Sequence, residues 1–112
     1  MYIEKAITAA LVAGTATAYY TADPNLKKAV IKKLTFKNTD TVAQTITVNL
    51  VPLSGSASDT NELAGPRSIL PDETWDVVEA VNMVLHGGGM IQALASTASK
   101  VNIQGSVLEH SY

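Results

Sequence analysis

Residues 40–53, DTVAQTITVNLVPL, are the most regularly patterned stretch of this 112-residue sequence. Threonine and asparagine residues alternate there with a second set, namely Val42, Gln44, Ile46, Val48 and Leu50. A period of two places each set on its own side of an extended chain, whereas a helix would scatter it around the circumference. The β-branched side chains favour the same conformation. We therefore predict a β-strand here, the clearest in the chain.

Segments before and after this strand show the same alternation. Residues 15–22, TATAYYTA, alternate small and larger side chains and end at the turn sequence ADPN. Residues 27–38 also alternate, with Val30, Leu34 and Phe36 on one face and Lys33, Thr35 and Lys37 on the other. Residues 90–96 and 100–110 resume the pattern near the end of the chain. Each segment is predicted to be a strand.

Irregular segments separate these strands. Residues 54–61, SGSASDTN, have no periodicity and predict a mobile loop suited to contacts. After it we expect a short strand at Ser68–Leu70, a turn, and a strand that carries Val77 and places Trp75 in the core. A short helix over residues 72–85 is the alternative, because the sequence PDE at 71–73 also resembles a helix start. The strand is favoured because tryptophan and valine are poor helix formers.

Together these segments predict an all-β fold, a single-domain antiparallel β-sandwich of seven to eight strands over residues 1–112. A jelly roll is the expected variant. Residues 1–24 are expected to form an N-terminal strand or arm that takes part in partner contacts. The apolar run from Ala6 to Ala18 is too short to span a bilayer, and we expect no membrane association. Glu4 and the interrupting threonines argue against a cleaved signal peptide.

Composition excludes several kinds of chemistry. The sequence contains no cysteine, so disulfides, thiolate nucleophiles and cysteine-ligated zinc are excluded. Its net charge of −2 provides no overall basic field for nucleic acid. His86 and His110 lie far apart in the sequence and lack the spacing of metal ligands. We expect no cofactor, no metal and no nucleic-acid partner.

Three consecutive glycines, Gly87, Gly88 and Gly89, follow His86. The surrounding sequence matches neither the GxxxxGK[ST] phosphate loop nor the GxGxxG dinucleotide fingerprint. Three glycines before an apolar strand are typical of a tight turn, because glycine tolerates positive φ and close backbone approach. We interpret them as the corner that leads into the penultimate strand, and His86 as a solvated or interface residue.

No catalytic constellation is evident. Asp72, Glu73, Asp76 and Glu79 lack the dense spacing of a calcium loop and are interpreted as a solvated turn. A small hydrolase that combines this acidic turn with His86 is a minor alternative, since no motif such as GxSxG fixes a nucleophile beside the imidazole. We therefore expect a protein that is not an enzyme.

Five of the eight basic residues lie between Lys27 and Lys37. Three interpretations remain open for this cluster. The lysines protect an edge strand from unwanted pairing, or they dock electrostatically on an acidic partner protein, or they bind nucleic acid, although no interleaved aromatic side chains support that use.

Residues 34–109 resemble the small β-sandwich virion proteins of tailed bacteriophages. The matching features are a strand and loop with Asn38, Pro52, Ser58 and Asn61, an "l.PgEt" turn at Leu70–Thr74, and a closing hairpin from Gly89 to Glu109. Two positions depart from the common pattern, with PDET for PGET and GGGM for a Gly-Asp turn. Both departures keep residues that favour turns.

A chain of this size is most similar to the capsid decoration proteins of that group, also called cement or staple proteins. The resemblance implies a bacteriophage virion protein on the outer capsid surface that staples neighbouring major capsid subunits and stabilises the DNA-filled head. It also implies self-association, with a dimer favoured over a trimer. Candidate partner-binding residues are Tyr2, Tyr19, Tyr20, Lys28, Lys33, Lys37 and His86.

The alternative is a head-fibre or tail accessory module that binds a carbohydrate or receptor on the host surface. Such a module needs an exposed aromatic platform. The sequence offers few candidates for it, namely Tyr2, Tyr19, Tyr20 and Tyr112, because Trp75 is expected in the core.

Overall fold

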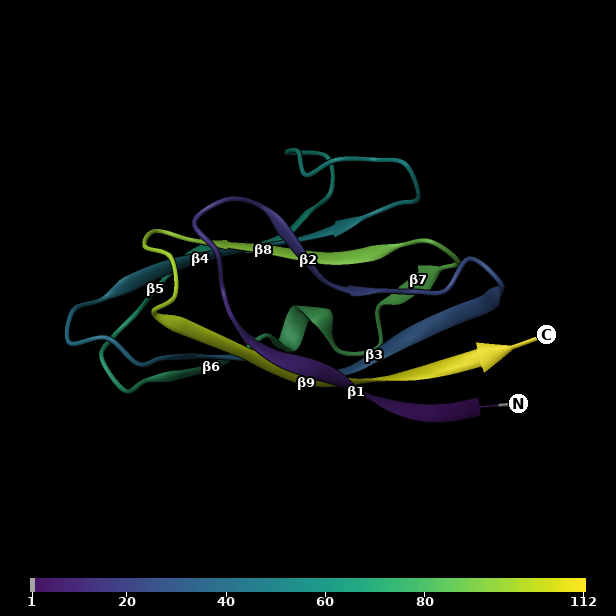
Figure 1. The fold of residues 1–112 in the computed structure, drawn as a ribbon, viewed down its shortest axis with the longest axis horizontal. Helices are drawn as coiled ribbons and strands as arrows, with labels where there is room; N and C mark the ends of the chain where they lie inside the picture. Colours follow the sequence, from purple (N-terminus) through teal and green to yellow (C-terminus); the bar gives the residue numbers. More distant parts are fainter. Residues whose placement is uncertain (1) are drawn as a thin grey trace.

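The computed structural model describes residues 2–112 and shows two antiparallel β-sheets packed face to face (Figure 1). One sheet contains β1 (Tyr2–Leu11), β9 (Val101–Ser111), β3 (Leu26–Asn38) and β6 (Thr74–Asp76) in that order, and β7 (Val84–His86) also pairs with β3. The other contains β2 (Thr17–Thr21), β8 (Met90–Ala95), β4 (Gln44–Val51) and β5 (Glu62–Ile69). The predicted all-β sandwich is confirmed.

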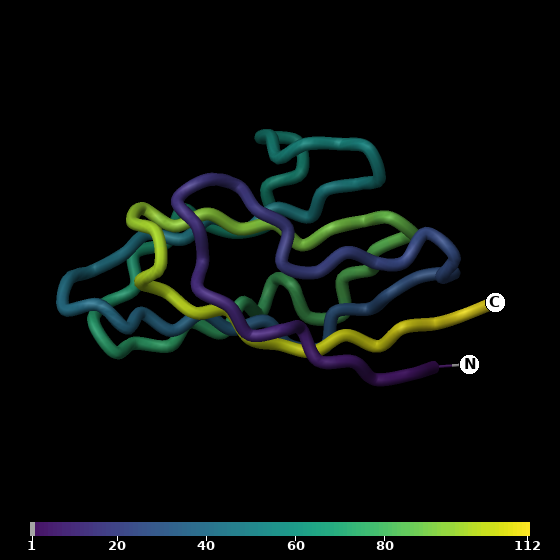
Figure 2. Tube along the Cα trace, viewed as in Figure 1, coloured from purple at the N-terminus to yellow at the C-terminus, as the bar shows by residue number. Residues whose placement is uncertain are grey.

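The strand pairings are nested from the ends of the chain towards its middle. β1 pairs with β9, β2 with β8, β3 with β7 and β6, and β4 with β5. Successive pairs alternate between the two sheets, so the chain is one long antiparallel ribbon rolled into two layers. This arrangement is the jelly roll expected from the sequence. As a consequence, both chain ends lie at the same end of the sandwich (Figure 2).

The core lies between the two sheets and is filled by alternate residues of the strands. Its largest fully buried side chains include Phe36, Ile31, Leu34, Ile46, Ile69, Ile91 and Ile103. Trp75 is 4% exposed and packs against Phe36, with ring centroids 5.9 Å apart, which confirms its predicted core position. Asn38, the last residue of β3, is fully buried, and its side chain donates hydrogen bonds to the carbonyls of Val42 and Ile69.

Residues 72–85 are neither one strand nor a helix of the predicted length. β6 is followed by a three-residue 3₁₀ helix, η1 (Val78–Ala80), and then by β7, and both strands pair with β3. Main-chain hydrogen bonds hold η1 and its flanks to β3, from Val77 to Leu34 and from Asn82 to Ile31. This interruption raises the strand count to nine, one more than expected.

The register of β3 corrects the prediction for residues 27–38. A β-bulge lies between Ile31 and Lys33 in the pairing with β9. The extra residue shifts the alternation, so Ile31 is buried and Val30 faces outward, opposite to the expected placement of Val30 with Leu34 and Phe36. β3 is also an interior strand, with β9 on one side and β6 and β7 on the other. Its lysines therefore do not protect a sheet edge.

Other predicted boundaries also change. The strand expected at Ser68–Leu70 begins earlier, at Glu62, and β4 begins at Gln44, which leaves Val42 58% exposed before the strand. Leu50 keeps its predicted face, because it is opposite the buried Ile91 and packs against the core, whereas Val51 is buried outside that core cluster. The closing segment is not a hairpin either, because β8 and β9 belong to different sheets.

The predicted loop between β4 and β5 projects from the sandwich (Figure 2). Asn61 organises it with its side-chain amide. The Asn61 oxygen accepts hydrogen bonds from the Ser58 amide at 3.0 Å and from the Asn49 side chain at 2.8 Å, and its Nδ2 donates to the Ser56 carbonyl. The loop is therefore internally bonded at its base.

Candidate partner-binding surface

Most of the predicted contact residues lie on the outer face of the sheet that contains β3. Residues directly opposite each other in antiparallel strands project from the same face of a sheet. In β3, Lys28, Lys33 and Lys37 alternate with buried residues and therefore point away from the core. The strand pairings place Tyr2 and His86 on the same outer face. We call this surface the lysine face.

One row of the lysine face crosses four strands. Tyr2 of β1 is opposite His110 of β9, His110 is opposite Lys28 of β3, and Lys28 is opposite His86 of β7. The rings of Tyr2 and His110 are stacked, with centroids 4.1 Å apart and planes 16° from parallel. His110 is not among the contact residues predicted from the sequence. The alternation in residues 100–110 places the His110 side chain on the face of the strand that points away from the core. Only the order of the strands brings it beside Tyr2 and Lys28.

His110 is held in an environment that disfavours its charge. Its Nδ1 is buried and has no hydrogen-bond partner. Desolvation is the largest cause that lowers the pKa of His110 below its usual value of 6.5, and the positive charges of Lys27 and Lys28 contribute to the same shift. The row therefore presents a neutral imidazole at pH 7. Lys28 separates the two histidines, and no group of potential metal ligands occurs among residues 2–112.

The next row of the lysine face is largely apolar. Glu4 is opposite Leu108, Leu108 is opposite Val30, and Val30 is opposite Val84. Val84 is 42% exposed, and Leu108 and Val30 are partly exposed. An apolar strip flanked by charged residues is the usual composition of a protein–protein interface, which has an apolar centre and a polar rim.

Tyr19 and Tyr20 are not part of this surface. Both lie on β2 in the other sheet. The Tyr19 hydroxyl accepts a hydrogen bond from the Ala13 amide at 2.6 Å. Tyr20 is 8% exposed, and its hydroxyl donates to the carboxylate of Glu109 across the core. The structure therefore places these two tyrosines in packing roles, and among the predicted contact residues of the N-terminal segment only Tyr2 of β1 lies on the lysine face.

The acidic turn and His86 are not brought together. Asp76 is opposite Thr35, whereas His86 is opposite Lys28 near the other end of β3. That separation is roughly 20 Å along an extended strand, far beyond hydrogen-bond distance. Asp72 and Glu73 lie in the exposed turn, where the Glu73 carboxylate accepts a hydrogen bond from the Leu70 amide. Asp76 and His86 therefore do not form the pair that the minor hydrolase alternative would need.

The glycine run forms the predicted corner before the penultimate strand. The Gly89 amide donates to the His86 carbonyl at 2.8 Å, and Gly88 has a φ of +86°, which closes a tight turn between β7 and β8. Gly88 donates to the Ala22 carbonyl and Ala22 donates to the Gly89 carbonyl. The corner is thus fixed to the end of β2, and it carries the chain from one sheet to the other.

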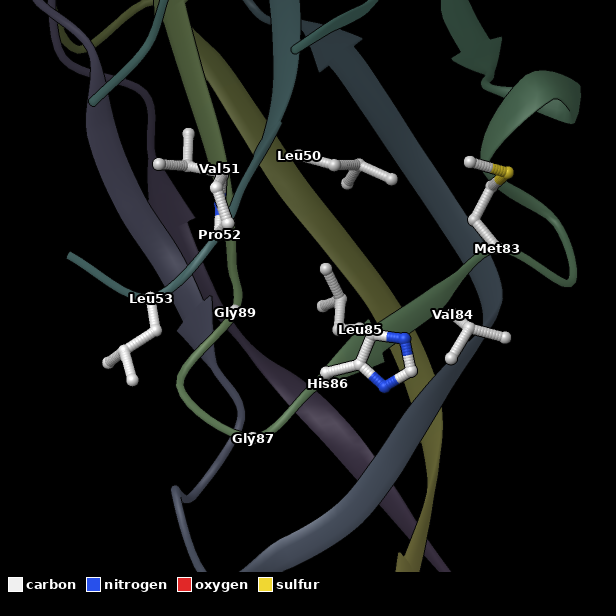
Figure 3. Close-up of a pocket in the computed structure, with 10 residues that line it drawn as sticks. All are labelled: Leu50, Val51, Pro52, Leu53, Met83, Val84, Leu85, His86, Gly87 and Gly89. Atoms are coloured by element: carbon white, nitrogen blue, oxygen red, sulfur yellow. The ribbon is translucent and has the colours of Figure 1, made fainter. Parts of the chain in front are cut away.

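A groove lies beside this corner (Figure 3). β7 and the glycine turn form one wall, and the end of β4 with the residues that follow it forms the other. Its volume is about 420 Å³, and it is lined by Leu50, Val51, Pro52, Leu53, Met83, Val84, Leu85, His86, Gly87 and Gly89. His86 supplies the only ionisable side chain of this lining, and it belongs both to the groove and to the lysine face.

No family model matches the sequence, and no curated relative matches it. Solved structures that share its fold include the following two. A chain from Bacillus endospore appendages, described as disulfide-linked pili, is 8% identical with a TM-score of 0.58, over 98% of this chain and 88% of that one. A chain from the T13 particle of infectious bursal disease virus is 11% identical with a TM-score of 0.51, over 98% of this chain.

The present chain spans only 31% of the viral chain. At these identities the similarity establishes the shared β-sandwich fold and no specific activity. Among residues 2–112, no helix has the length and apolar character needed to cross a membrane.

Proposed function

We propose that this chain is a structural protein of a larger assembly, and specifically a decoration protein on the outer surface of a bacteriophage capsid. It binds the major capsid protein through the lysine face and staples neighbouring subunits. The observation that carries this proposal is the position of the lysines. They lie on an interior strand, where edge protection does not explain them.

The charge of the lysine face fits an acidic protein partner. Lys28, Lys33 and Lys37 follow the central strand over roughly 30 Å. Glu4 and Asp76 are the acidic residues that project from the same face. No contact between residues 2–112 pairs any of the three lysines with a carboxylate. A line of unpaired ammonium groups beside an apolar strip favours docking on a surface of opposite charge.

The two structural neighbours support an assembly role in general terms. One comes from a pilus-like appendage and the other from a viral particle. The appendage is described as disulfide-linked, whereas these 112 residues contain no cysteine. These 112 residues therefore cannot form disulfide links of that kind. The capsid interpretation rests on the resemblance of residues 34–109 to bacteriophage virion proteins. No reaction, cofactor, membrane or nucleic acid is part of the proposed function.

Stapling requires a second contact, and the free edge of β1 is the proposed site of self-association into a dimer. Sheet edges are usually protected from pairing by short strands, bulges or proline. β6 and β7 have three residues each, β2 is short and bulged, and β5 contains Pro66. In contrast, Tyr2–Ile7 pair with β9 in unbroken register and leave a regular edge.

Dimer formation would make the protein bivalent. Joining two modest contacts in one molecule raises avidity by about 10²- to 10⁴-fold. Ile3, 53% exposed on the free edge, provides a test by analytical ultracentrifugation. Ile3→Asp is expected to weaken association, whereas Leu70→Asp, at a residue 59% exposed in the β5–β6 turn, is the matched control. Equal association by both variants would contradict the use of this edge.

The shell contact is tested with purified bacteriophage particles. Mass spectrometry should find the chain in intact particles at a fixed ratio to the shell protein. Particles stripped of the chain should lose heat resistance and regain it when the purified chain is added. Lys33→Glu should weaken rebinding in a salt-dependent way, and Lys100→Glu, an exposed lysine outside the lysine face, should not. Stripped particles as robust as complete ones would exclude the cementing role.

A head-fibre or tail module that binds host carbohydrate remains the competing function. Burial of Tyr20 and Trp75 and the hydrogen bond of Tyr19 leave Tyr2 and Tyr112 as exposed aromatic residues, and Tyr2 is stacked on His110. Glycan-array binding that is lost in Tyr2→Ala would favour this alternative over capsid stapling.

A further inference from the structure

We propose that the groove beside the glycine corner binds an apolar side chain of the partner, and that a carboxylate next to that side chain pairs with Lys28. The inference rests on the proposed function and deepens it, because it specifies the chemistry of the segment that the lysine face meets. The occupant is an acidic segment with one hydrophobic anchor, such as a leucine or phenylalanine beside an aspartate or glutamate.

The lining of the groove is exposed and apolar in the isolated chain. Leu53 is 61% exposed, Val84 is 42% exposed and Met83 is 39% exposed, and the partly buried Leu50 belongs to the wall formed by β4 (Figure 3). Covering such side chains is favourable by about 25 cal/mol for each Å² of apolar surface removed from water. The groove therefore favours an apolar occupant.

The glycine turn packs closely against two neighbouring segments of the chain. A Cβ atom at Gly88 would lie 2.5 Å from the Leu53 side chain, so the turn and Leu53 are in close contact. A Cβ atom at Gly87 would lie 2.6 Å from the Pro24 carbonyl oxygen. The absence of side chains at these two positions lets the turn pack against both neighbours. Main-chain hydrogen bonds also join this turn to Ala22. A wall that is bonded in this way loses less conformational entropy on binding than a free loop, which favours affinity.

The charge beside the groove defines the second part of the occupant. His86 lines the groove and is directly opposite Lys28 on the lysine face. The nearby carboxylate of Asp23 accepts a hydrogen bond from the Asn25 amide within its own turn. The ammonium group of Lys28 therefore lies next to the groove without an ion-pair partner. A carboxylate of the occupant, next to its apolar anchor, would complement this charge.

The first test uses 8-anilinonaphthalene-1-sulfonate, a probe that joins aromatic rings to an anionic group. We expect saturable binding at one site, with amide chemical-shift changes centred on Gly87–Gly89 of the unmodified protein. Met83→Glu should weaken binding by about tenfold or more, equivalent to 1.4 kcal/mol. Leu70→Glu, at an exposed apolar residue outside the groove, should leave binding unchanged.

The charge contribution is separated by a second probe, the uncharged dye Nile red. Lys28→Gln should weaken binding of the sulfonate probe and leave that of Nile red unchanged, whereas Lys37→Gln, farther along β3, should affect neither. Shift changes centred elsewhere, or equal losses in Met83→Glu and Leu70→Glu, would overturn the groove as the site. The shift measurement does not depend on the folding of any variant.

Rebinding to stripped particles distinguishes the inference from the proposed function. If Met83→Glu rebinds normally while Lys33→Glu does not, the lysine face docks on the shell and the anchor in the groove is wrong. If both variants rebind poorly while Leu70→Glu rebinds normally, the inference is supported. If the unmodified chain does not rebind but the probe maps to the groove, the shell function fails and the proposed partner contact fails with it.

Discussion

The hydroxyl of Tyr20 on β2 donates a hydrogen bond to the carboxylate of Glu109 on β9, and this bond joins the two sheets across the core. Burial, followed by the hydrogen bond and the negative charge of Glu109, raises the pKa of Tyr20 well above its usual value of 10. Tyr20 is thus a structural cross-link between the layers, and not the contact residue predicted from the sequence.

Stability should therefore fall at alkaline pH. Above about pH 10 the unfolded chain loses the phenolic proton of Tyr20 while the folded chain retains it. The stabilisation is fully present below pH 10 and is lost as the pH rises towards the folded-state pKa. Urea unfolding at pH 8 and at pH 11 measures the effect. Tyr20→Phe should show a smaller decrease in the free energy of unfolding over this interval, and an equal decrease would contradict the assignment.

Asn38→Ala should destabilise the fold. The side chain is fully buried, donates hydrogen bonds to the Val42 and Ile69 carbonyls, and accepts one from the Asp40 amide. Its removal leaves these groups unpaired, and we expect a loss of about 2–4 kcal/mol in the free energy of unfolding. Urea denaturation measures this loss, with Asn25→Ala in an exposed turn as the control. A loss below about 0.5 kcal/mol, as for an ordinary surface change, would contradict the role of Asn38.

Gly105→Ala should destabilise the sheet at the bulge of β3. A Cβ atom at Gly105 would clash with the Lys33 carbonyl oxygen and lie 3.0 Å from Ile7 Cδ1. We expect a loss of about 1–3 kcal/mol, as for overpacking of a core. Gly14→Ala is the matched control, because its nearest heavy atom would be 3.8 Å away. Thermal unfolding of both variants provides the comparison, and similar melting temperatures would show that β3 yields at this position.

His110 should titrate below pH 6.5 in the folded protein. Desolvation and the charges of Lys27 and Lys28 lower its pKa, so the unfolded chain binds the proton more readily. The stabilisation is present above about pH 6.5 and is lost as the pH falls through the folded-state pKa. Histidine resonances followed by NMR measure this titration, and His110→Gln identifies the signal. Tyr2→Ala, which removes the stacked ring, should raise the pKa towards 6.5, and an unchanged midpoint would show that the Tyr2 ring does not contribute to the shift.

Much of the fold could be predicted because alternation is a local property. The strand after Asp40, the polar loop, the turn near Asp72 and the glycine corner all follow from neighbouring residues. The prediction was wrong where pairing with a distant strand changes the alternation. The bulge between Ile31 and Lys33 depends on β9, so no feature of residues 27–38 by themselves shows that Ile31 is buried in place of Val30.

The candidate surface was predicted only in part. The lysines and His86 were selected as polar residues beside apolar patterns, whereas their common face became evident from the strand pairings. His110 and the groove were missed because each depends on strands far apart in the sequence. The groove forms where the end of β4 lies next to β7. The pair of Tyr2 and His110 joins residues from both ends of the chain.

The sequence by itself determined the β class, the approximate strands, the glycine turn and the absence of any cysteine chemistry, because these depend on residue type and spacing along the chain. Only the tertiary structure decided that β3 is interior, that Tyr20 is buried against Glu109, and that His86 lies opposite Lys28 beside an apolar groove. The physical reason is that strand order and register depend on long-range hydrogen bonding and packing between sheets. Local alternation specifies which residues share a face of one strand, but not which strands lie next to each other.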